Sequence, residues 1–442
     1  MSNIEGTLRN SANMIASITS LDLLLSGLRD RYCCIAQEGS PYAKFAGANL
    51  TTDQVILTSN KGELSDETII SSTNISDELV LKGVNAFLPS CFTSGTLENW
   101  SQKMGITIVA PNSNLQKQLE DKVIFNDVLH KNNISVPVSH VLRSNDDVVN
   151  TLPFTGVLQV PDSWGGLGTY FIDSKEHLSN VISENSLPFP LLYREFITGR
   201  ALGVTILVGE SNTMFSALRS QLFIPAQDDP PYFIGTQWIP KSSISAKAII
   251  SLERSLSQIA DAIRALGFVG MANVDCIVEG DDVFIVECNP RQSICTCQIA
   301  QHPNLLNGYD LMEEYVRCFM EGDCSGDISF IPDTDFEGCV LDLDQFGRRF
   351  SGRRINKPWD VGIYNPNVDG NPYSLDLSNL KAEDLLIVHT IQKNTLLNLT
   401  SNLGVVLSDL PVADILSDKI VINSRGESIL DFVSKLVESC LE

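Results

Sequence analysis

The chain has 442 residues, of which 43% are hydrophobic and 19% are charged, and its formal net charge is −23. This composition excludes a disordered chain, and the length allows two to four folded domains. An acidic protein does not suit nucleic acid or anionic membranes, which attract basic surfaces, although a pocket for phosphate can still be locally basic.

Short apolar runs alternate with polar turns over the first hundred or so residues. The stretch 14–25 reads as a buried helix, and no apolar run reaches the roughly 18 residues of a membrane-spanning helix. Strands are expected at 54–58, 84–88 and 107–110, with a helix at 96–104. This β–α–β order predicts a small α/β domain.

A single helix is expected next, beginning near Ser113 and continuing past Val128. A glycine-rich turn between two strands then covers 157–171. Because β-type residues follow the glycines, this is not a Rossmann turn, but its N–H groups could cradle an anion. An ordinary flexible hairpin tip explains the turn equally well when it is considered alone.

A hairpin with acidic residues follows at 273–289. Its apolar residues occupy even positions, so one face is predicted to be core; they are Val274, Cys276, Val278, Phe284, Val286 and Cys288. A five-residue connection at 279–283 would place Asp275 opposite Glu287 and Asn273 opposite Asn289. Opposed carboxylates destabilise a strand pair, so we expect a cation between them, and hard oxygen ligands favour Mg²⁺ or Mn²⁺ over zinc. The alternative is a solvated face with chance acidic residues.

The last part of the chain has a different composition. From about 327, prolines lie among polar turns, and an amphipathic helix is expected at 428–441, which indicates a third domain. The 11 cysteines show no zinc spacing and lie mostly in apolar segments. We therefore expect reduced core cysteines in a cytoplasmic protein.

The order of these parts resembles the ATP-grasp superfamily over about residues 105–293. The elements that carry the resemblance are Gly105-Ile-Thr-Ile-Val-Ala-Pro111, Asp121-Lys122, Ile134-Ser-Val-Pro137, Gly165-Gly166-Leu-Gly168, Arg194-Glu195-Phe-Ile-Thr-Gly199-Arg200, Asp275 and Glu287-Cys-Asn289-Pro-Arg291. The Asp-x₁₁-Glu-x-Asn-Pro-Arg element is the most specific of them.

The resemblance implies an α+β fold, the ATP-grasp fold, in which two α+β subdomains clamp ATP. It implies an N-terminal Rossmann-like α/β domain at 1–111 and an ATP-grasp domain at 112–326, in which about 138–198 form a glycine-loop lid. The remaining residues, 327–442, would form a small C-terminal α/β domain.

The function implied is that of an ATP-dependent carboxylate–amine ligase of specialised metabolism. Such an enzyme forms an amide or peptide bond through an acyl phosphate, with ATP and Mg²⁺ (or Mn²⁺) as cofactors and a small carboxylic acid and an amine or amino acid as substrates. Phosphorylation of an enol or other oxygen before amine addition is an alternative, as is a catalytically silent nucleotide-binding protein. Formation of a homodimer is left open.

The resemblance also implies roles for individual residues. Asp275, Glu287 and Asn289 would hold the metal, and Arg291 would stabilise charge during catalysis. The remaining residues would bind the nucleotide: Lys122, Gln159, Gly165, Gly166, Gly168, Glu195, Phe196 and Ile197.

Two positions depart from the family pattern. Gln159 stands where relatives carry a phosphate-binding lysine, and Ala201 stands where many carry an acid that binds ribose. A neutral amide still donates hydrogen bonds but without charge assistance. Arg219 and Lys241 are further cationic candidates, with solvated surface positions as the alternative.

Overall fold

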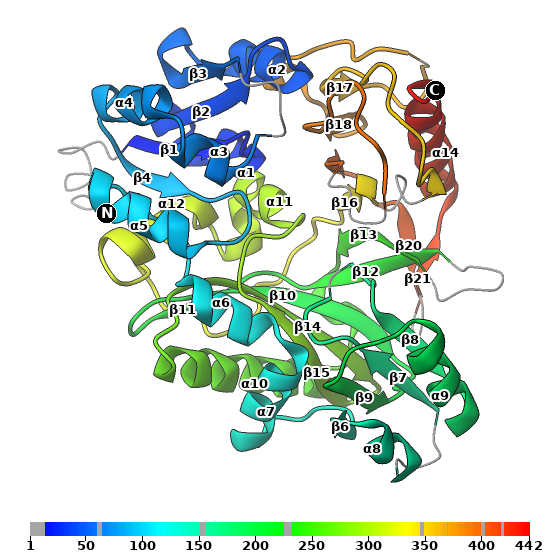
Figure 1. Cartoon of the computed structure of the whole chain (residues 1–442). Coiled ribbons are helices and arrows are strands. Elements are labelled where there is room, and N and C mark those ends of the chain that lie inside the picture. The colour runs from blue at the N-terminus through cyan, green and yellow to red at the C-terminus, as the bar shows by residue number, and fades with distance from the viewer. Residues whose placement is uncertain are drawn as a thin grey trace.

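The computed structural model describes residues 14–59, 64–150, 155–163, 165–224, 232–344, 349–368, 370–398, 403–416 and 420–442. Helices and strands are mixed along the chain, as expected for an α+β protein (Figure 1). Among the helices in these ranges, none combines the length and apolar composition that crossing a bilayer requires.

The N-terminal part forms a parallel sheet with strand order β3-β2-β1-β4-β5, and helices cover it. The strands are β1 (Met14–Ile18), β2 (Tyr32–Gln37), β3 (Val55–Thr58), β4 (Val84–Leu88) and β5 (Thr107–Ile108). The helices are α1 (Leu21–Leu25), α2 (Pro41–Asn49), α3 (Asp66–Ile70), α4 (Thr73–Leu81) and α5 (Gly95–Met104), with 3₁₀ turns η1 (Gly27–Arg31) and η2 (Thr52–Gln54). This is the expected Rossmann-like arrangement.

The prediction of one buried helix at 14–25 was wrong. The segment contains strand β1, and the short helix α1 begins after Ser20, whose side chain accepts a hydrogen bond from the Leu23 N–H. Strand β1 lies between β2 and β4 and is almost completely buried. A strand that is buried on both faces reads as a continuous apolar run, which periodicity cannot distinguish from a helix.

The helix predicted after Ser113 is divided in two. Helix α6 (Ser113–Glu120) ends at Asp121, and α7 (Lys122–Lys131) begins there. The Asp121 side chain accepts hydrogen bonds from the Val123 and Ile124 N–H groups, so it caps α7. The break places Lys122 at the first position of the new helix.

A second, smaller sheet has the order β6-β9-β7-β8. Its strands are β6 (Ser139–Leu142), β7 (Gly156–Gln159), β8 (Thr169–Ile172) and β9 (Leu191–Glu195), and α8 (Asn145–Asn150) and α9 (Lys175–Glu184) lie in the connections. The glycine-rich turn joins β7 to β8, as predicted.

The largest sheet has the order β15-β14-β10-β12-β13-β16-β19-β18-β17, with β11 paired to β10. The strands up to the hairpin are β10 (Arg200–Val208), β11 (Thr213–Phe215), β12 (Arg219–Ile224), β13 (Tyr232–Trp238), β14 (Gly270–Glu279) and β15 (Asp282–Asn289). The helices of this part are α10 (Ala246–Ala265), α11 (Thr296–Gln301) and α12 (Leu311–Met320), with 3₁₀ turns η3 (Lys241–Ser243) and η4 (Pro303–Leu306).

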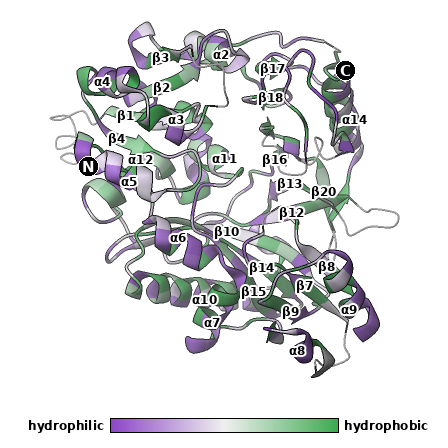
Figure 2. Ribbon diagram, viewed as in Figure 1, coloured by the Kyte–Doolittle hydropathy of each residue, from purple (hydrophilic) through white to green (hydrophobic). Residues whose placement is uncertain are grey.

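Helix α10 provides the core beneath the hairpin. Its apolar stripe includes Leu252, Leu256 and Ile259, which are buried in one cluster with Val274 and Cys276 of β14. The two-sided character of α10 is visible in the alternating colours along it (Figure 2). The hairpin is therefore supported from one side by a long amphipathic helix.

Four strands of the C-terminal part continue the large sheet, and two later strands, at 413–415 and 420–422, pair with each other in a separate sheet. Strand β13 pairs with β16, with Gly235 opposite Leu341 and Gln237 opposite Cys339, across the predicted boundary at 326–327. The elements of this part are β16 (Cys339–Asp342), β17 (Gly362–Tyr364), η5 (Leu377–Asn379), β18 (Leu385–Val388), β19 (Val405–Ser408), β20 (Ala413–Ile415), β21 (Ile420–Ile422) and α14 (Ser424–Ser439). The division into domains at 111 and 326, with a lid at about 138–198, stays a prediction.

All the cysteines are free thiols, and all but Cys91 are buried. This agrees with the expectation of reduced core cysteines.

Candidate active site

The acidic hairpin has the predicted register at its functional end. Asp275 pairs with Glu287, and Asn273 pairs with Asn289. The predicted five-residue connection was wrong, because Glu279 pairs with Asp282 around a two-residue turn and the register shifts after Asp275. The tight turn and this β-bulge together give the same register that a longer loop would have given.

The bulge changes which residues of β15 face the core. Val283 and Ile285 are buried, whereas Phe284 and Val286, predicted to be core, are only half-buried. An extra residue in one strand reverses the alternation of side chains beyond it. On the other side of the bulge Cys288 stays buried, so Glu287 keeps the face that the period-2 pattern predicted.

Asp275 is held beside a buried arginine by the order of the strands. Gly203 of β10 lies between Asp275 of β14 and Arg219 of β12, and one Arg219 Nη atom is 3.8 Å from Asp275 Oδ1. A Cβ on Gly203 would lie 2.7 Å from that oxygen and 2.8 Å from Arg219 Nη2. Glycine at this position is therefore required for the close approach of the two charges. Arg219 is 3% exposed, so the alternative of a solvated surface residue was wrong for it.

The two opposed carboxylates differ in their electrostatic surroundings. Burial, together with the negative charge of Glu287, raises the pKa of Asp275 to about 7, although Arg219 opposes this shift. Burial would also raise the pKa of Glu287, but Lys122, the Asn289 amide and Arg194 outweigh it and hold that pKa below its usual value. The Lys122 Nζ atom lies 3.3 Å from Glu287. The pKa values of these two adjacent carboxyl groups are thus shifted in opposite directions, because the neighbouring donors and cations outweigh burial only at Glu287.

Arg291 is fixed beside the hairpin by partners from several elements. Its Nε donates to Glu120 of α6 at 3.0 Å, and one Nη donates to Asn289 Oδ1 at 3.3 Å. Its guanidinium also lies over the Phe92 ring, 5.1 Å from the centroid. The adjacent backbone is held by Asn273, whose amide donates to the Arg291 carbonyl at 2.6 Å. The guanidinium is thus oriented before any substrate binds.

The Asn289 amide bridges Glu287 and Arg291. Its nitrogen donates to Glu287 Oε1 at 3.3 Å, and its oxygen accepts from Arg291. To act as a metal ligand, as the sequence resemblance implies, the amide would have to turn its oxygen toward the carboxylates.

The glycine loop has the backbone conformation that its sequence requires. Gly165, Gly166 and Gly168 have φ values of 59°, 77° and 66°. At Gly168 a Cβ would lie 2.9 Å from the Ser163 Cβ, whereas at Gly166 nothing lies within 4 Å. The Lys122 ammonium donates to the Ser163 carbonyl, so this residue connects the glycine loop to Glu287.

In the segment that ends β9 and follows it, two of the three residues expected to bind the nucleotide already use their backbone N–H groups within the protein. The Glu195 N–H donates to the Val138 carbonyl at 2.8 Å, and the Phe196 N–H donates to Thr155 at 3.1 Å. Among the described residues, none accepts a hydrogen bond from the Ile197 N–H. Of the three positions implied by the resemblance, Ile197 therefore has the N–H available to a ligand.

Two further positions considered in the sequence, Lys241 and Ala201, make their contacts elsewhere. Lys241 pairs with Glu253 at 3.2 Å and donates to the Ile331 carbonyl, so these contacts tie it to the region around α10. Ala201 pairs with Ile277 near the tip of the hairpin. Neither contributes a charge beside Glu287.

The donors at the hairpin suit a hard divalent cation. Within the described ranges, no group of three or more His, Cys, Asp and Glu residues gathers as a metal site. Asp275 and Glu287 supply two carboxylates, and Mg²⁺ is commonly bound by one or two carboxylates, water and substrate phosphates. The residues present therefore suit an ion whose remaining ligands are water and substrate phosphates, and they do not complete its coordination by themselves.

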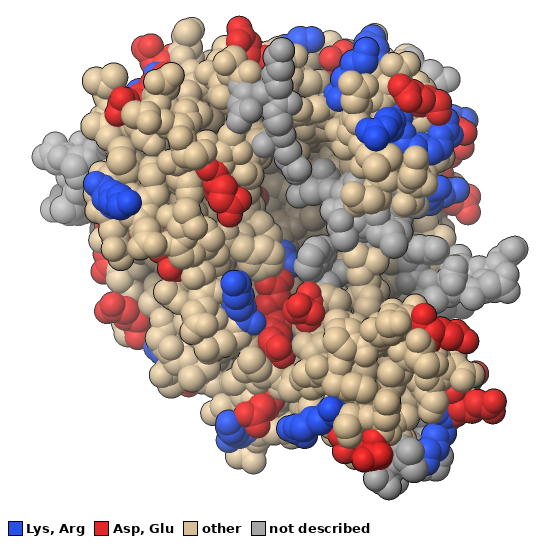
Figure 3. All heavy atoms as spheres, viewed as in Figure 1, with Lys and Arg blue, Asp and Glu red and all other residues tan. Residues whose placement is uncertain are grey.

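A large cavity opens next to Arg291. It has a volume of about 1000 Å³, and its walls come from the N-terminal sheet, the segment after the hairpin and the C-terminal part. The contributing segments include Ser17–Asp22, Pro89–Phe92, Arg291–Ile294 and Gln392–Leu396. Acidic and basic side chains gather beside a hollow in the middle of the face drawn in Figure 3.

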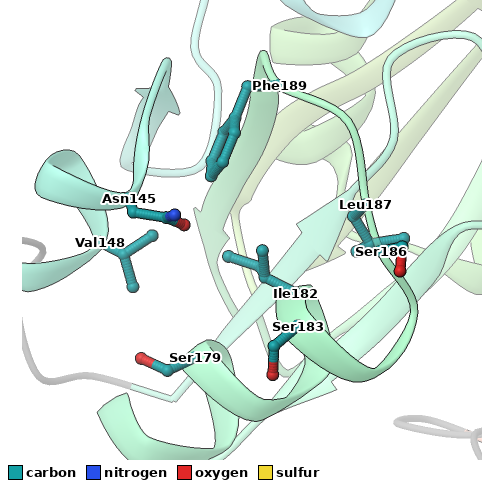
Figure 4. Close-up of a pocket in the computed structure, with 8 residues that line it drawn as sticks. All are labelled: Asn145, Val148, Ser179, Ile182, Ser183, Ser186, Leu187 and Phe189. Atoms are coloured by element: carbon teal, nitrogen blue, oxygen red, sulfur yellow. The ribbon is translucent and has the colours of Figure 1, made fainter.

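A second pocket, of about 550 Å³, lies between α8 and α9 in the small sheet's region (Figure 4). Its lining side chains are uncharged: Asn145, Val148, Ser179, Ile182, Ser183, Ser186, Leu187 and Phe189. None of them belongs to the hairpin or the glycine loop, so this pocket is not the candidate site.

A family model that describes the ATP-grasp domain matches residues 119–294. By this match, residues 119–294 of the chain form an ATP-grasp domain. The matched segment contains Lys122, the glycine loop and the complete acidic hairpin.

Two relatives illustrate the match in sequence. The chain is 24% identical over 204 residues to the arginine-specific carbamoyl phosphate synthase large chain of Bacillus subtilis, covering 43% of this chain and 18% of that protein. It is 27% identical over 202 residues to the carbamoyl phosphate synthase large chain of Pseudothermotoga lettingae, again covering 43% and 18%. The match thus spans about a fifth of the length of these relatives.

Solved structures share the fold over nearly the whole chain. The biotin carboxylase domain of Hydrogenobacter thermophilus 2-oxoglutarate carboxylase, in complex with MgADP, ADP and bicarbonate, superposes with a TM-score of 0.60 at 13% identity, covering 97% of this chain and 90% of that one. N5-carboxyaminoimidazole ribonucleotide synthetase from Thermus thermophilus has a TM-score of 0.55 at 12% identity, covering 96% and 98%. At these identities the likeness establishes the ATP-grasp fold.

Proposed function

We propose that this protein is an ATP-dependent ligase that joins a small carboxylic acid to an amine through an acyl phosphate. The main support is the pair of opposed carboxylates, Asp275 and Glu287, with the cations Lys122, Arg219 and Arg291 close by. Acidic and basic groups in one place suit a metal ion together with a polyphosphate.

In the proposed reaction an oxygen of the substrate carboxylate attacks the γ-phosphorus of ATP, and ADP leaves. The amine then attacks the carbonyl carbon, its proton is lost, and phosphate leaves with one of the original carboxylate oxygens. Asp275 and Glu287 would hold Mg²⁺, which would offset the negative charge of the phosphates. Arg291 would stabilise the oxyanion that forms at the carbonyl carbon.

The glycine loop and Lys122 would enclose the phosphates. Lys122 already contacts both the loop, at Ser163, and Glu287. It would therefore hold the glycine loop over the reacting groups. A loop that excludes water protects an acyl phosphate from hydrolysis.

The cavity beside Arg291 would receive the acid or the amine. Arg291 lines it, together with polar side chains from the N-terminal part and the C-terminal part. The C-terminal part would then contribute to substrate selection. A location in the cytoplasm and the pairing of two copies stay predictions.

The test is to incubate the protein with ATP, Mg²⁺ and a panel of amino acids and other small acids and amines, and to measure ADP. We expect ADP release to require both a carboxylate and an amine. With a carboxylate labelled with oxygen-18, one labelled oxygen per turnover should appear in inorganic phosphate.

Other outcomes identify the alternatives. Binding of MgATP with no ADP release for any pairing would indicate a nucleotide-binding protein without turnover. Release of ADP without transfer of the label would indicate phosphorylation of an enol or another oxygen.

A further inference from the structure

Gln159, which stands where relatives have a phosphate-binding lysine, is in contact with a buried arginine. Gln159 lies on β7 and Arg194 on the adjacent strand β9, where Arg194 pairs with Val157. One Arg194 Nη atom donates to Gln159 Oε1 at 3.2 Å. The two residues are 7% and 2% exposed, so this contact is inside the protein.

The contact fixes the orientation of the Gln159 amide. A guanidinium has only donors, so the Gln159 oxygen must face Arg194, and the amide NH₂ must face away from it. No acceptor within the described part of the chain takes a hydrogen bond from this NH₂ group. Two amide hydrogens are therefore available next to the start of the glycine loop.

Other contacts hold Arg194 in place. The same Nη donates to the Val286 carbonyl, at the bulge of the hairpin, at 2.8 Å, and the second Nη lies 3.4 Å from Asn126 Oδ1. Arg194 thus connects the small sheet, helix α7 and the metal-binding hairpin.

The charge of Arg194 is incompletely compensated. Among the described residues, no carboxylate lies within ion-pair distance of Arg194, and none accepts a hydrogen bond from its Nε. Burial lowers its pKa to about 10, opposed by the more distant charge of Glu287, so the side chain stays protonated at neutral pH. A buried cation of this kind is stabilised when an anion approaches.

We propose that Arg194 and Gln159 together replace the missing lysine. Arg194 supplies the positive charge and orients Gln159, whose amide NH₂ donates to a phosphate oxygen of the bound nucleotide. Gln159 is the contacting residue, and Arg194 is a positioning residue that acts through it. The proposal rests on the proposed function only in requiring that the site binds a nucleotide.

The experiment compares the dissociation constants of MgATP, MgADP and adenosine, measured by calorimetry, for the full-length wild type, Arg194→Gln and Gln159→Leu. Because a hydrogen bond that involves a charged group contributes about 1.5–3 kcal/mol, we expect each variant to bind MgATP and MgADP roughly 10- to 100-fold more weakly. Adenosine carries no phosphate, so its affinity should change less than about threefold for each variant.

The double variant Gln159→Lys/Arg194→Gln moves the positive charge from β9 to β7. It should recover most of the lost affinity for MgATP. Arg264→Gln is the matched control, because Arg264 makes several hydrogen bonds to chain groups around Gly209 and Thr213, away from the hairpin. It should change the unfolding temperature without changing the ratio of MgATP affinity to adenosine affinity.

Three results would overturn the proposal. The first is wild-type affinity for MgATP in Arg194→Gln, and the second is an equal loss for adenosine and MgATP, which would indicate a purely structural role. The third is failure of the double variant to bind MgATP better than Arg194→Gln. If Arg194→Gln does not fold, Gln159→Leu, which keeps Arg194 in place, tests the claim, and wild-type affinity for MgATP in that variant overturns it. A wild type that binds no MgATP would instead contradict the proposed function.

Discussion

The half-buried carboxylates of the hairpin and of helix α1 have different surroundings. At the hairpin, Asp275 and Glu287 face each other, with Lys122 at 3.3 Å from Glu287 and Arg219 at 3.8 Å from Asp275. At the wall of the large cavity, Asp22 lies in the first turn of α1 and forms no ion pair with any described residue.

The difference separates two kinds of acidic group. In a chain with a net charge of −23, cations gathered around one pair of acids form a local site where a metal ion and a polyphosphate can enter together. Asp22 has no cation within ion-pair distance among the residues that the structure describes. The groups that face it, Tyr42 on α2, Cys297 on α11 and Tyr315 on α12, all have pKa values raised by burial and are neutral. A lone carboxyl in such a place responds by taking up a proton.

The largest effect is expected when the hairpin pair is broken. Glu287→Gln keeps the shape of the side chain but removes one of the two carboxylates, so turnover with MgATP should fall by at least about 100-fold. The unfolding temperature should change little, because relief of the repulsion between two opposed like charges offsets the lost ion pair with Lys122. ADP release and Mg²⁺ titration measure the effect.

Glu279→Gln is the matched control for that substitution. Glu279 is exposed and lies at the tip of the same hairpin, where it pairs with Asp282. Its substitution should leave turnover unchanged. Undiminished activity in Glu287→Gln would show that Glu287 is not a metal ligand.

A smaller effect is expected when a cation beside the pair is removed. Lys122→Gln loses the ion pair with Glu287 but could still donate to Ser163. We expect MgATP to bind about 10- to 30-fold more weakly, consistent with the loss of one charged hydrogen bond. Calorimetry measures the affinity, and Lys117→Gln, an exposed lysine on α6, is the control. Equal affinities in the two variants would argue that Lys122 only supports the fold.

The pairing at the hairpin could be predicted because its signals are local. A period-2 pattern and the spacing between Asp275 and Glu287 were enough to give the register, even though the turn and the bulge were not foreseen. Two compensating changes, a shorter turn and an extra residue at the bulge, leave this register unchanged.

The cations around the hairpin could not be predicted in the same way. Arg219 reaches Asp275 only because β10 lies between β14 and β12, and Glu120 reaches Arg291 from α6. These contacts depend on the order of strands and on tertiary packing, not on spacing along the chain. Gly203, a glycine inside a long apolar strand, was the available signal, since such a glycine often marks a close approach.

The smallest effect is expected at Asp22, and it concerns stability. Burial raises the pKa of this half-buried carboxyl to about 7, so between pH 4 and 7 the folded state holds a proton that the unfolded state releases. This contribution to stability is present at low pH and is lost as the pH rises through 7.

In Asp22→Asn the loss is absent, so the variant should gain on the order of 1–2 kcal/mol in free energy of unfolding relative to wild type between pH 5 and pH 8. Urea unfolding at both pH values measures the gain, and the exposed Asp30→Asn should show none. An equal pH dependence in Asp22→Asn and wild type would mean that the pKa of Asp22 is the same in the folded and unfolded states, and the contrast with the hairpin would no longer hold.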